Sequence, residues 1–188
     1  MVIELMPDKV MWQRFAPFLL LVAAAGCGAR TDTAVAQFSL TSPAFQNGQA
    51  IPAQFTCSGA GQSPPLAWGE PPQGTESFAL VVDDPDAPSA TFHHWGAYDI
   101  PANLRSLDAG AGNSAGSAFA QALNDFGKPG YSAPCPPPGH GPHHYRFRLF
   151  AVDVDRLGVP ANAKAGDVDK EANRHVVGRA ELTGIYGS

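Results

Sequence analysis

The chain has 188 residues, a length that suits one domain with a single core. Hydrophobic residues make up 44% of it and charged residues 15%, a globular composition that excludes an intrinsically disordered chain. The formal net charge is −5 and no stretch is rich in Lys or Arg, so nucleic acid is not an expected partner.

The first 27 residues are predicted to be an export signal. Two basic residues precede a short apolar run over residues 15–25, which a glycine and Cys27 follow. This order is typical of a secretory signal, and the run is too short to cross a bilayer, which takes about 20 apolar residues. Its ending resembles a bacterial lipobox, in which Cys27 would be lipidated and become the new N-terminus. Ordinary cleavage is the alternative, and Met11 offers a cleaner start to the signal than Met1.

We therefore expect an exported lipoprotein that is anchored in a membrane and faces the periplasm or the cell exterior. Residues 28–36 are small and polar and are expected to form a tether. The remaining residues, 37–188, are predicted to form one domain.

Short strands dominate the predicted domain. They cover residues 37–40, 54–56, 66–68, 77–82, 91–100, 145–152 and 180–186. The run over 77–82 is almost continuously apolar and is bounded by turn residues, which predicts a central strand. One helix is expected over 167–177, with Asp167 as its cap. Residues 108–122 are predicted to be a surface loop with a weak helical turn near 118–123. Many strands with one late helix indicate an antiparallel sandwich or roll.

Two acidic residues, Asp84 and Asp86, directly follow the predicted central strand. Side chains at the end of a buried strand lie at the rim of a sheet, where binding sites are commonly built. Pro85 and Pro88 stiffen this loop, so the carboxylates would be held in place. An ordinary acidic turn is the alternative interpretation.

Neighbouring histidines, His93 and His94, lie inside a predicted strand and therefore point to opposite faces of the sheet. A lone strand histidine more often has a structural role. Beside a carboxylate it would instead be protonated near neutral pH and could receive an anion.

Residues 131–145 are the most unusual stretch, because their proline density excludes a helix or a paired strand. A rigid loop can hold a small polar ligand with little loss of entropy on binding. His140, His143 and His144 lie here, but their spacing, without a Cys pair or an HExxH motif, argues against a metal site.

Taken in chain order, three segments resemble the signature of the phosphatidylethanolamine-binding protein (PEBP) family: residues 84–88, 94–95 and 139–145. Flanking segments resemble its bacterial, Raf kinase inhibitor-like branch: residues 55–59, 63–66, 124–127 and 134–139. The resemblance extends over about residues 38–186.

The resemblance implies a mainly β fold of two antiparallel sheets with Greek-key-like topology and one late helix. It also implies a non-catalytic protein, without a cofactor, that binds a small anionic or zwitterionic ligand such as phosphate or phosphoethanolamine. Carried over position by position, the ligand-binding residues are Asp84, Asp86, Pro88, His94, Pro136, His143 and Tyr145. His144 stands where an arginine is usual in the family.

Two other classes of function stay open at this point. One is a protein-interaction module that inhibits a protease or a kinase. The other is a hydrolase, although no Gly-x-Ser-x-Gly elbow surrounds any serine. With Cys27 lipidated, Cys57 and Cys135 would remain in an oxidising compartment, in loops beside the expected pocket. We expect a disulfide between them, with two buried thiols as the alternative.

Overall fold

The computed structural model describes Val2 and residues 38–187. The predicted lipidation site Cys27 and the tether over residues 28–36 lie outside the described residues, as does the signal segment apart from Val2. Among the described residues, no helix combines the length and the apolar character that crossing a membrane requires.

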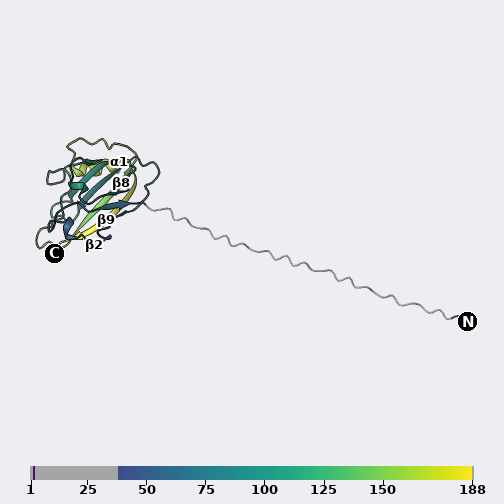
Figure 1. The fold of residues 1–188 in the computed structure, drawn as a ribbon, viewed down its shortest axis with the longest axis horizontal. Helices are drawn as coiled ribbons and strands as arrows, with labels where there is room; N and C mark the ends of the chain where they lie inside the picture. Colours follow the sequence, from purple (N-terminus) through teal and green to yellow (C-terminus); the bar gives the residue numbers. More distant parts are fainter. Residues whose placement is uncertain (1, 3–37, 188) are drawn as a thin grey trace. The chain divides into compact units, whose positions relative to one another are not determined.

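Two sheets and one α-helix make up the domain (Figure 1). The larger sheet has the strand order β2-β9-β8-β4-β5-β7, and the smaller sheet has the order β1-β3-β6. The strands are β1 Leu40–Thr41, β2 Gln49–Ala50, β3 Leu66–Trp68, β4 Ser77–Asp84, β5 Phe92–Pro101, β6 Ser106–Leu107, β7 Ala120–Gln121, β8 His143–Val152 and β9 Val176–Tyr186. All pairs are antiparallel except β2 with β9. The prediction of a mainly β fold with two sheets and one late helix is confirmed.

Strand β4 lies in the middle of the larger sheet and is buried on both faces, as its apolar run predicts. On one face, Phe78 and Leu80 belong to a core that includes Trp68 of the smaller sheet. On the other face, Ala79 and Val81 pack in a second core. Burying an aliphatic or aromatic side chain of this kind contributes about 1.5–3 kcal/mol to folding, so the two cores hold β4 and its ends firmly.

The α-helix, α1, extends over Ala165–His175 and covers the second core with Val168 and Ala172. Lys164 caps it, and the Asp167 carboxylate accepts the Lys164 backbone N–H at 3.1 Å. Asp167 therefore lies in the first turn and is not the cap itself, because its side chain reaches back by three residues. The helix ends where β9 begins, so β9 is longer than the sequence predicts.

Three local predictions are wrong for physical reasons. Residues Ala53–Phe55 form a 3-10 turn (η1) and not a strand, because the Thr56 hydroxyl donates to the Ala53 carbonyl and closes the turn. The helical turn expected near residues 118–123 is absent there, and a 3-10 turn (η2) lies at Ala111–Asn113 instead. Strand β8 begins at His143, since that residue pairs with Tyr186 of β9.

Candidate binding site

The ends of three inner strands of the larger sheet lie side by side. Strand β4 ends there, and its antiparallel neighbours β5 and β8 begin there. The sheet register therefore places Asp84, His94 and Tyr145 close together, although they are far apart in the sequence. They surround a cavity of about 250 Å³. Its lining residues are Asp84, Ala87, Pro88, Phe92, His94, Phe126, Cys135, Pro136, Pro137, His143 and Tyr145.

The cavity contains a buried pair of Asp84 and His143. His143 Nδ1 lies 2.7 Å from Asp84 Oδ2, and the two side chains are only 3% and 5% exposed. The other carboxylate oxygen, Oδ1, accepts the Asp86 backbone N–H at 2.9 Å. Because a carboxylate accepts hydrogen bonds, His143 donates from Nδ1, and its Nε2 atom is without a hydrogen-bond partner within residues 38–187.

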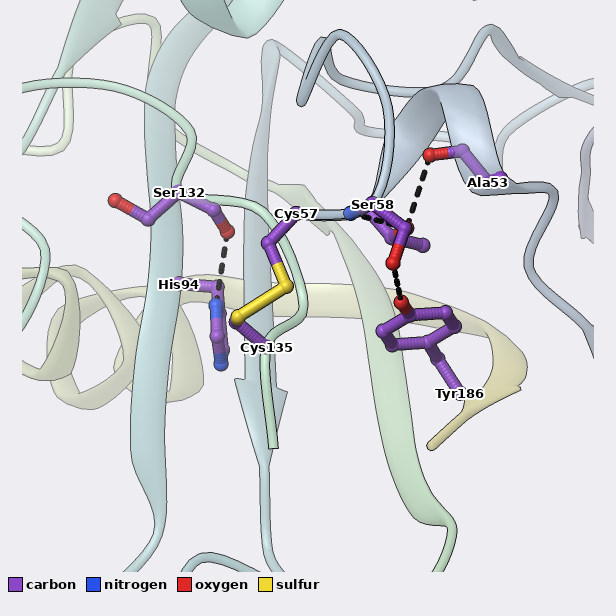
Figure 2. Close-up of a disulfide and its surroundings, with 8 residues drawn as sticks. Ala53, Cys57, Ser58, His94, Ser132, Cys135 and Tyr186 are labelled. Atoms are coloured by element: carbon purple, nitrogen blue, oxygen red, sulfur yellow. Dashed lines mark hydrogen bonds between the residues drawn. A yellow bond between two sulfur atoms is a disulfide. The ribbon is translucent and has the colours of Figure 1, made fainter. Parts of the chain in front are cut away.

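His94 is held in a comparable way by the backbone. Its Nδ1 atom lies 2.8 Å from the Ser132 carbonyl oxygen, as Figure 2 shows. A carbonyl only accepts, so Nδ1 carries the proton, and Nε2 has no hydrogen-bond partner among the described residues.

Burial lowers the pKa of His94 below its ordinary value of 6.5, although the Ser132 carbonyl and Asp84 act in the opposite direction. The sequence-based expectation of a protonated His94 near neutral pH is therefore wrong. The cost of placing a charge in this enclosed position outweighs the attraction of the nearby carboxylate.

Tyr145 supplies a hydroxyl group that has no hydrogen-bond partner among the described residues. The side chain is 1% exposed and its oxygen is fully buried. Its ring lies 5.2 Å from that of His94, in an edge-on arrangement. Burial, followed by the charge of Asp84, raises the pKa of Tyr145 well above its ordinary value. The group is therefore a neutral phenol that can donate a hydrogen bond to a ligand.

Asp86 lies beside the cavity and is not among its lining residues. Its carboxylate accepts the backbone N–H of His144 at 2.8 Å and contacts His144 Nδ1 at 2.7 Å. These two hydrogen bonds, the backbone one first, lower the pKa of Asp86. The structure thus brings together six of the seven sequence-predicted ligand-binding residues and turns Asp86 toward His144.

An aromatic rim, which the sequence analysis missed, borders the cavity. The Phe92 ring lies 4.9 Å from that of His94, and Phe126 lies 4.7 Å from Phe92. Phe126 is 61% exposed, which is unusual for a large apolar side chain. Asn124 holds the turn that carries it by accepting the Phe126 backbone N–H. Phe92 lies two residues before His94 and therefore on the same face of the strand. This spacing could have predicted Phe92 as part of the site from the sequence.

The structure joins Cys57 and Cys135 in a disulfide, with their Cα atoms 5.4 Å apart (Figure 2). The bond links residues that lie 78 positions apart in the chain. Cys135 lines the cavity, so the disulfide forms part of its wall.

A larger hollow of about 590 Å³ lies elsewhere, beside Asp99 and Arg156. Those two residues pair with each other at 3.7 Å. The smaller cavity is the better candidate because Tyr145 lines it, and the buried hydroxyl of Tyr145 has no partner among the described residues. Within residues 38–187, no group of three His, Cys, Asp or Glu side chains is arranged to hold a metal ion.

Comparison with known proteins agrees with this architecture. Residues 41–187 match the family model of the phosphatidylethanolamine-binding protein. A UPF0098 protein of Aquifex aeolicus is 44% identical over 146 residues, which cover 77% of this chain and 85% of that relative. LppC of Mycobacterium tuberculosis, named as a candidate lipoprotein, is 38% identical over 148 residues, covering 79% of this chain and 71% of LppC.

Two solved structures share the fold. The crystal structure of Escherichia coli YbcL, described as a member of the mammalian PEBP family, superposes with a TM-score of 0.77 at 34% identity and covers 81% of this chain and 99% of YbcL. CT736 of Chlamydia trachomatis gives a TM-score of 0.72 at 33% identity, with 81% and 98% covered. The chain therefore belongs to the phosphatidylethanolamine-binding protein family.

Proposed function

We propose that this protein is a lipid-anchored binding protein whose strand-end cavity takes a small zwitterionic headgroup of the phosphoethanolamine type. The observation that carries this proposal is the hydroxyl of Tyr145, a residue that lines the cavity: this hydroxyl is buried and has no hydrogen-bond partner among the described residues. A buried donor of this kind costs about 1–3 kcal/mol when it is left unsatisfied, and a ligand would recover that cost.

The charges around the cavity favour a zwitterion over a bare phosphate. The described lining residues include the carboxylate of Asp84 but no Lys or Arg. An ammonium group can approach Asp84 and the free Nε2 atom of His94, while a phosphate oxygen accepts from Tyr145. An anion placed against Nε2 of His94 requires that nitrogen to gain a proton, so anion binding and proton uptake are coupled.

Binding without catalysis fits the chemistry of the lining residues. Cys135 would be the strongest nucleophile of the lining side chains as a free thiolate, but its sulfur is bonded to Cys57. Asp84 and His143 are hydrogen-bonded to each other, and the lining residues that the structure describes include no serine or threonine for them to activate. A hydrolase is the less well supported class.

The membrane anchor rests on the sequence of the N-terminus, where Cys27 ends a lipobox-like segment. The name of LppC as a candidate lipoprotein supports this assignment, since LppC is similar over the domain. Anchoring in turn implies export to the periplasm or the cell exterior.

Isothermal titration calorimetry of phosphoethanolamine against the purified domain tests the proposed function. Tyr145→Phe should weaken binding about tenfold, because one hydrogen bond to a charged group is worth about 1.5 kcal/mol or more. Tyr98→Phe is the matched control, since Tyr98 packs in the second core on the other face of the sheet. Absence of binding by wild-type protein, together with inhibition of a protease or a kinase, would favour the interaction module instead.

A further inference from the structure

One side of the cavity is formed by the proline wall, which we define as residues Pro134–Pro142. Cys135, Pro136 and Pro137 of this segment line the cavity. Five of its nine residues are prolines. Proline has no backbone N–H, so the segment has few donors with which to fasten itself to the rest of the domain.

Between its two ends, which continue into residue 133 and into β8, the proline wall is linked to other segments mainly through one residue, Cys57. Outside the strand pairings, the one backbone hydrogen bond among the described residues that leaves the wall runs from the Cys57 N–H to the Pro134 carbonyl, at 3.0 Å. The other backbone bond of this segment, from His140 to Pro137, stays inside it. The disulfide from Cys57 to Cys135 is the second attachment.

Hydrogen bonds of the neighbouring residues hold Cys57 in position, and Figure 2 shows the disulfide with these bonds around it. Its neighbour Thr56 is fully buried, and the Thr56 hydroxyl donates to the Ala53 carbonyl at 2.9 Å. On the other side, Ser58 donates its N–H to the Thr56 hydroxyl, and its own hydroxyl lies 2.5 Å from that of Tyr186 in β9. The disulfide therefore connects a segment that several hydrogen bonds fix to the proline wall, which forms few hydrogen bonds with the rest of the domain.

A second hollow also borders the proline wall. It has a volume of about 380 Å³ and is lined by Cys57, Ser58, Pro136, Pro137, Pro138, Tyr186 and Gly187. Pro136 and Pro137 line both spaces, and each space is lined by one of the two half-cystines, Cys135 in the binding cavity and Cys57 in the second hollow. The wall and its disulfide thus border both the binding cavity and this second hollow.

We propose that the Cys57–Cys135 disulfide is a positioning element that fixes the proline wall and thereby sets the size of the cavity. Breaking the bond removes the covalent one of the wall's two links to Cys57 and leaves a single hydrogen bond, so the wall can move toward the second hollow. A small headgroup then loses contacts with Pro136 and Pro137. This inference rests on the proposed binding function and adds a redox dependence to it.

Reduction provides the direct test, because both half-cystines are exposed. Dithiothreitol transfers two electrons and two protons to the cysteine pair, which becomes two thiols, while the reagent closes to its cyclic disulfide. We expect the affinity for phosphoethanolamine to fall at least tenfold on reduction and to recover on reoxidation. The double variant Cys57→Ala/Cys135→Ala should match the reduced protein, with or without the reagent. Equal affinities in the oxidised and reduced states would overturn the proposal.

Loss of global stability must be separated from movement of the wall. Val168→Ala is the control, because it removes buried atoms beneath α1 and leaves the cavity untouched. It should lower the melting temperature without changing the affinity. If it weakened binding as much as reduction does, the effect of the disulfide would be one of general stability.

A measurement without ligand keeps the inference separate from the proposed function. The aromatic NMR signals of His94 and Tyr145 should shift or broaden on reduction, since both rings line the cavity. If the signals change on reduction but the oxidised protein binds no phosphoethanolamine, the proposed function alone would be refuted. Signals that stay unchanged on reduction would refute the positioning role of the disulfide, whatever the ligand.

Discussion

Asp84 Oδ2 and His143 Nδ1 lie 2.7 Å apart in the interior, although 59 residues separate them in the chain. This contact ties the end of β4 to the start of β8 at the edge where the cavity opens. The contact also uses one ring nitrogen of His143 and fixes the orientation of the Asp84 carboxylate. The lining of the cavity therefore depends on a pair that forms only when β4 and β8 come together.

The first prediction concerns the stability that this buried pair provides. Asp84→Ala leaves His143 Nδ1 buried without its acceptor, so the free energy of unfolding should fall by about 1–3 kcal/mol. Asp86→Ala is the matched control, because it breaks an aspartate–histidine pair whose side chains are 42% and 53% exposed. Exposed pairs contribute about 0–1 kcal/mol. Urea denaturation of both variants checks the difference, and equal losses would contradict the importance of burial.

The second prediction is a loss of stability in acid that arises from His94. Its pKa is lowered in the folded protein by burial, so between the folded value and about 6.5 the unfolded chain binds more protons. Stability therefore falls as the pH drops through this window, by at most about 1.4 kcal/mol per pH unit. His94→Asn retains a donor for the Ser132 carbonyl but does not titrate. Its free energy of unfolding should change less between pH 7 and pH 5 than that of the wild type, and parallel curves would refute the assignment.

The third prediction concerns anion binding by the same residue. Sulfate is a suitable probe because its charge is constant between pH 7 and pH 5. Its affinity should rise as the pH falls, since protonated Nε2 of His94 becomes a charged donor. His94→Asn should remove most of this rise. A wild-type affinity that is independent of pH would show that no anion contacts His94.

The fourth prediction concerns Asp83, which precedes the site and faces the opposite side of the sheet. Its carboxylate is fully buried and forms ion pairs with Arg146, at 2.7 Å, and with Arg148. Asp83→Asn removes the buried carboxylate that pairs with both Arg146 and Arg148 and leaves Arg148 with Asp169 as its remaining ion-pair partner among the described residues, so it should cost on the order of 3 kcal/mol. Asp169→Asn also removes an Arg148 partner, but its side chain is 24% exposed and the loss should be smaller. Thermal and urea unfolding of the two variants measure both losses of stability. A larger loss in Asp169→Asn than in Asp83→Asn would contradict the prediction.

The fifth prediction addresses the anchor. Cys27→Ser removes the sulfur that lipidation requires, so the protein should move from the membrane fraction to the soluble fraction and no longer incorporate labelled fatty acid. Wild-type protein that is soluble and unlabelled would exclude the lipoprotein assignment.

The sequence by itself determined the family and the general architecture. The apolar run over residues 77–82 predicts a buried central strand, because continuous hydrophobicity is a local property that does not depend on the rest of the fold. The ordered motifs around Asp84, His94 and Tyr145 likewise identify the family without coordinates. The sequence also pointed to a link between the only two cysteines of the predicted domain.

Only the tertiary structure decided the electrostatics and the boundaries of the site. The sequence places Asp84 and Asp86 in the same loop, but the pairing of β8 with β4 brings His143 to one carboxylate and His144 to the other. The lowered pKa of His94 depends on burial by segments that are distant in the chain. Phe126 joins the rim because its turn folds against Phe92. The protonation state of His94, the enclosure of the cavity and the access to it arise from contacts between distant segments, which local sequence patterns do not encode.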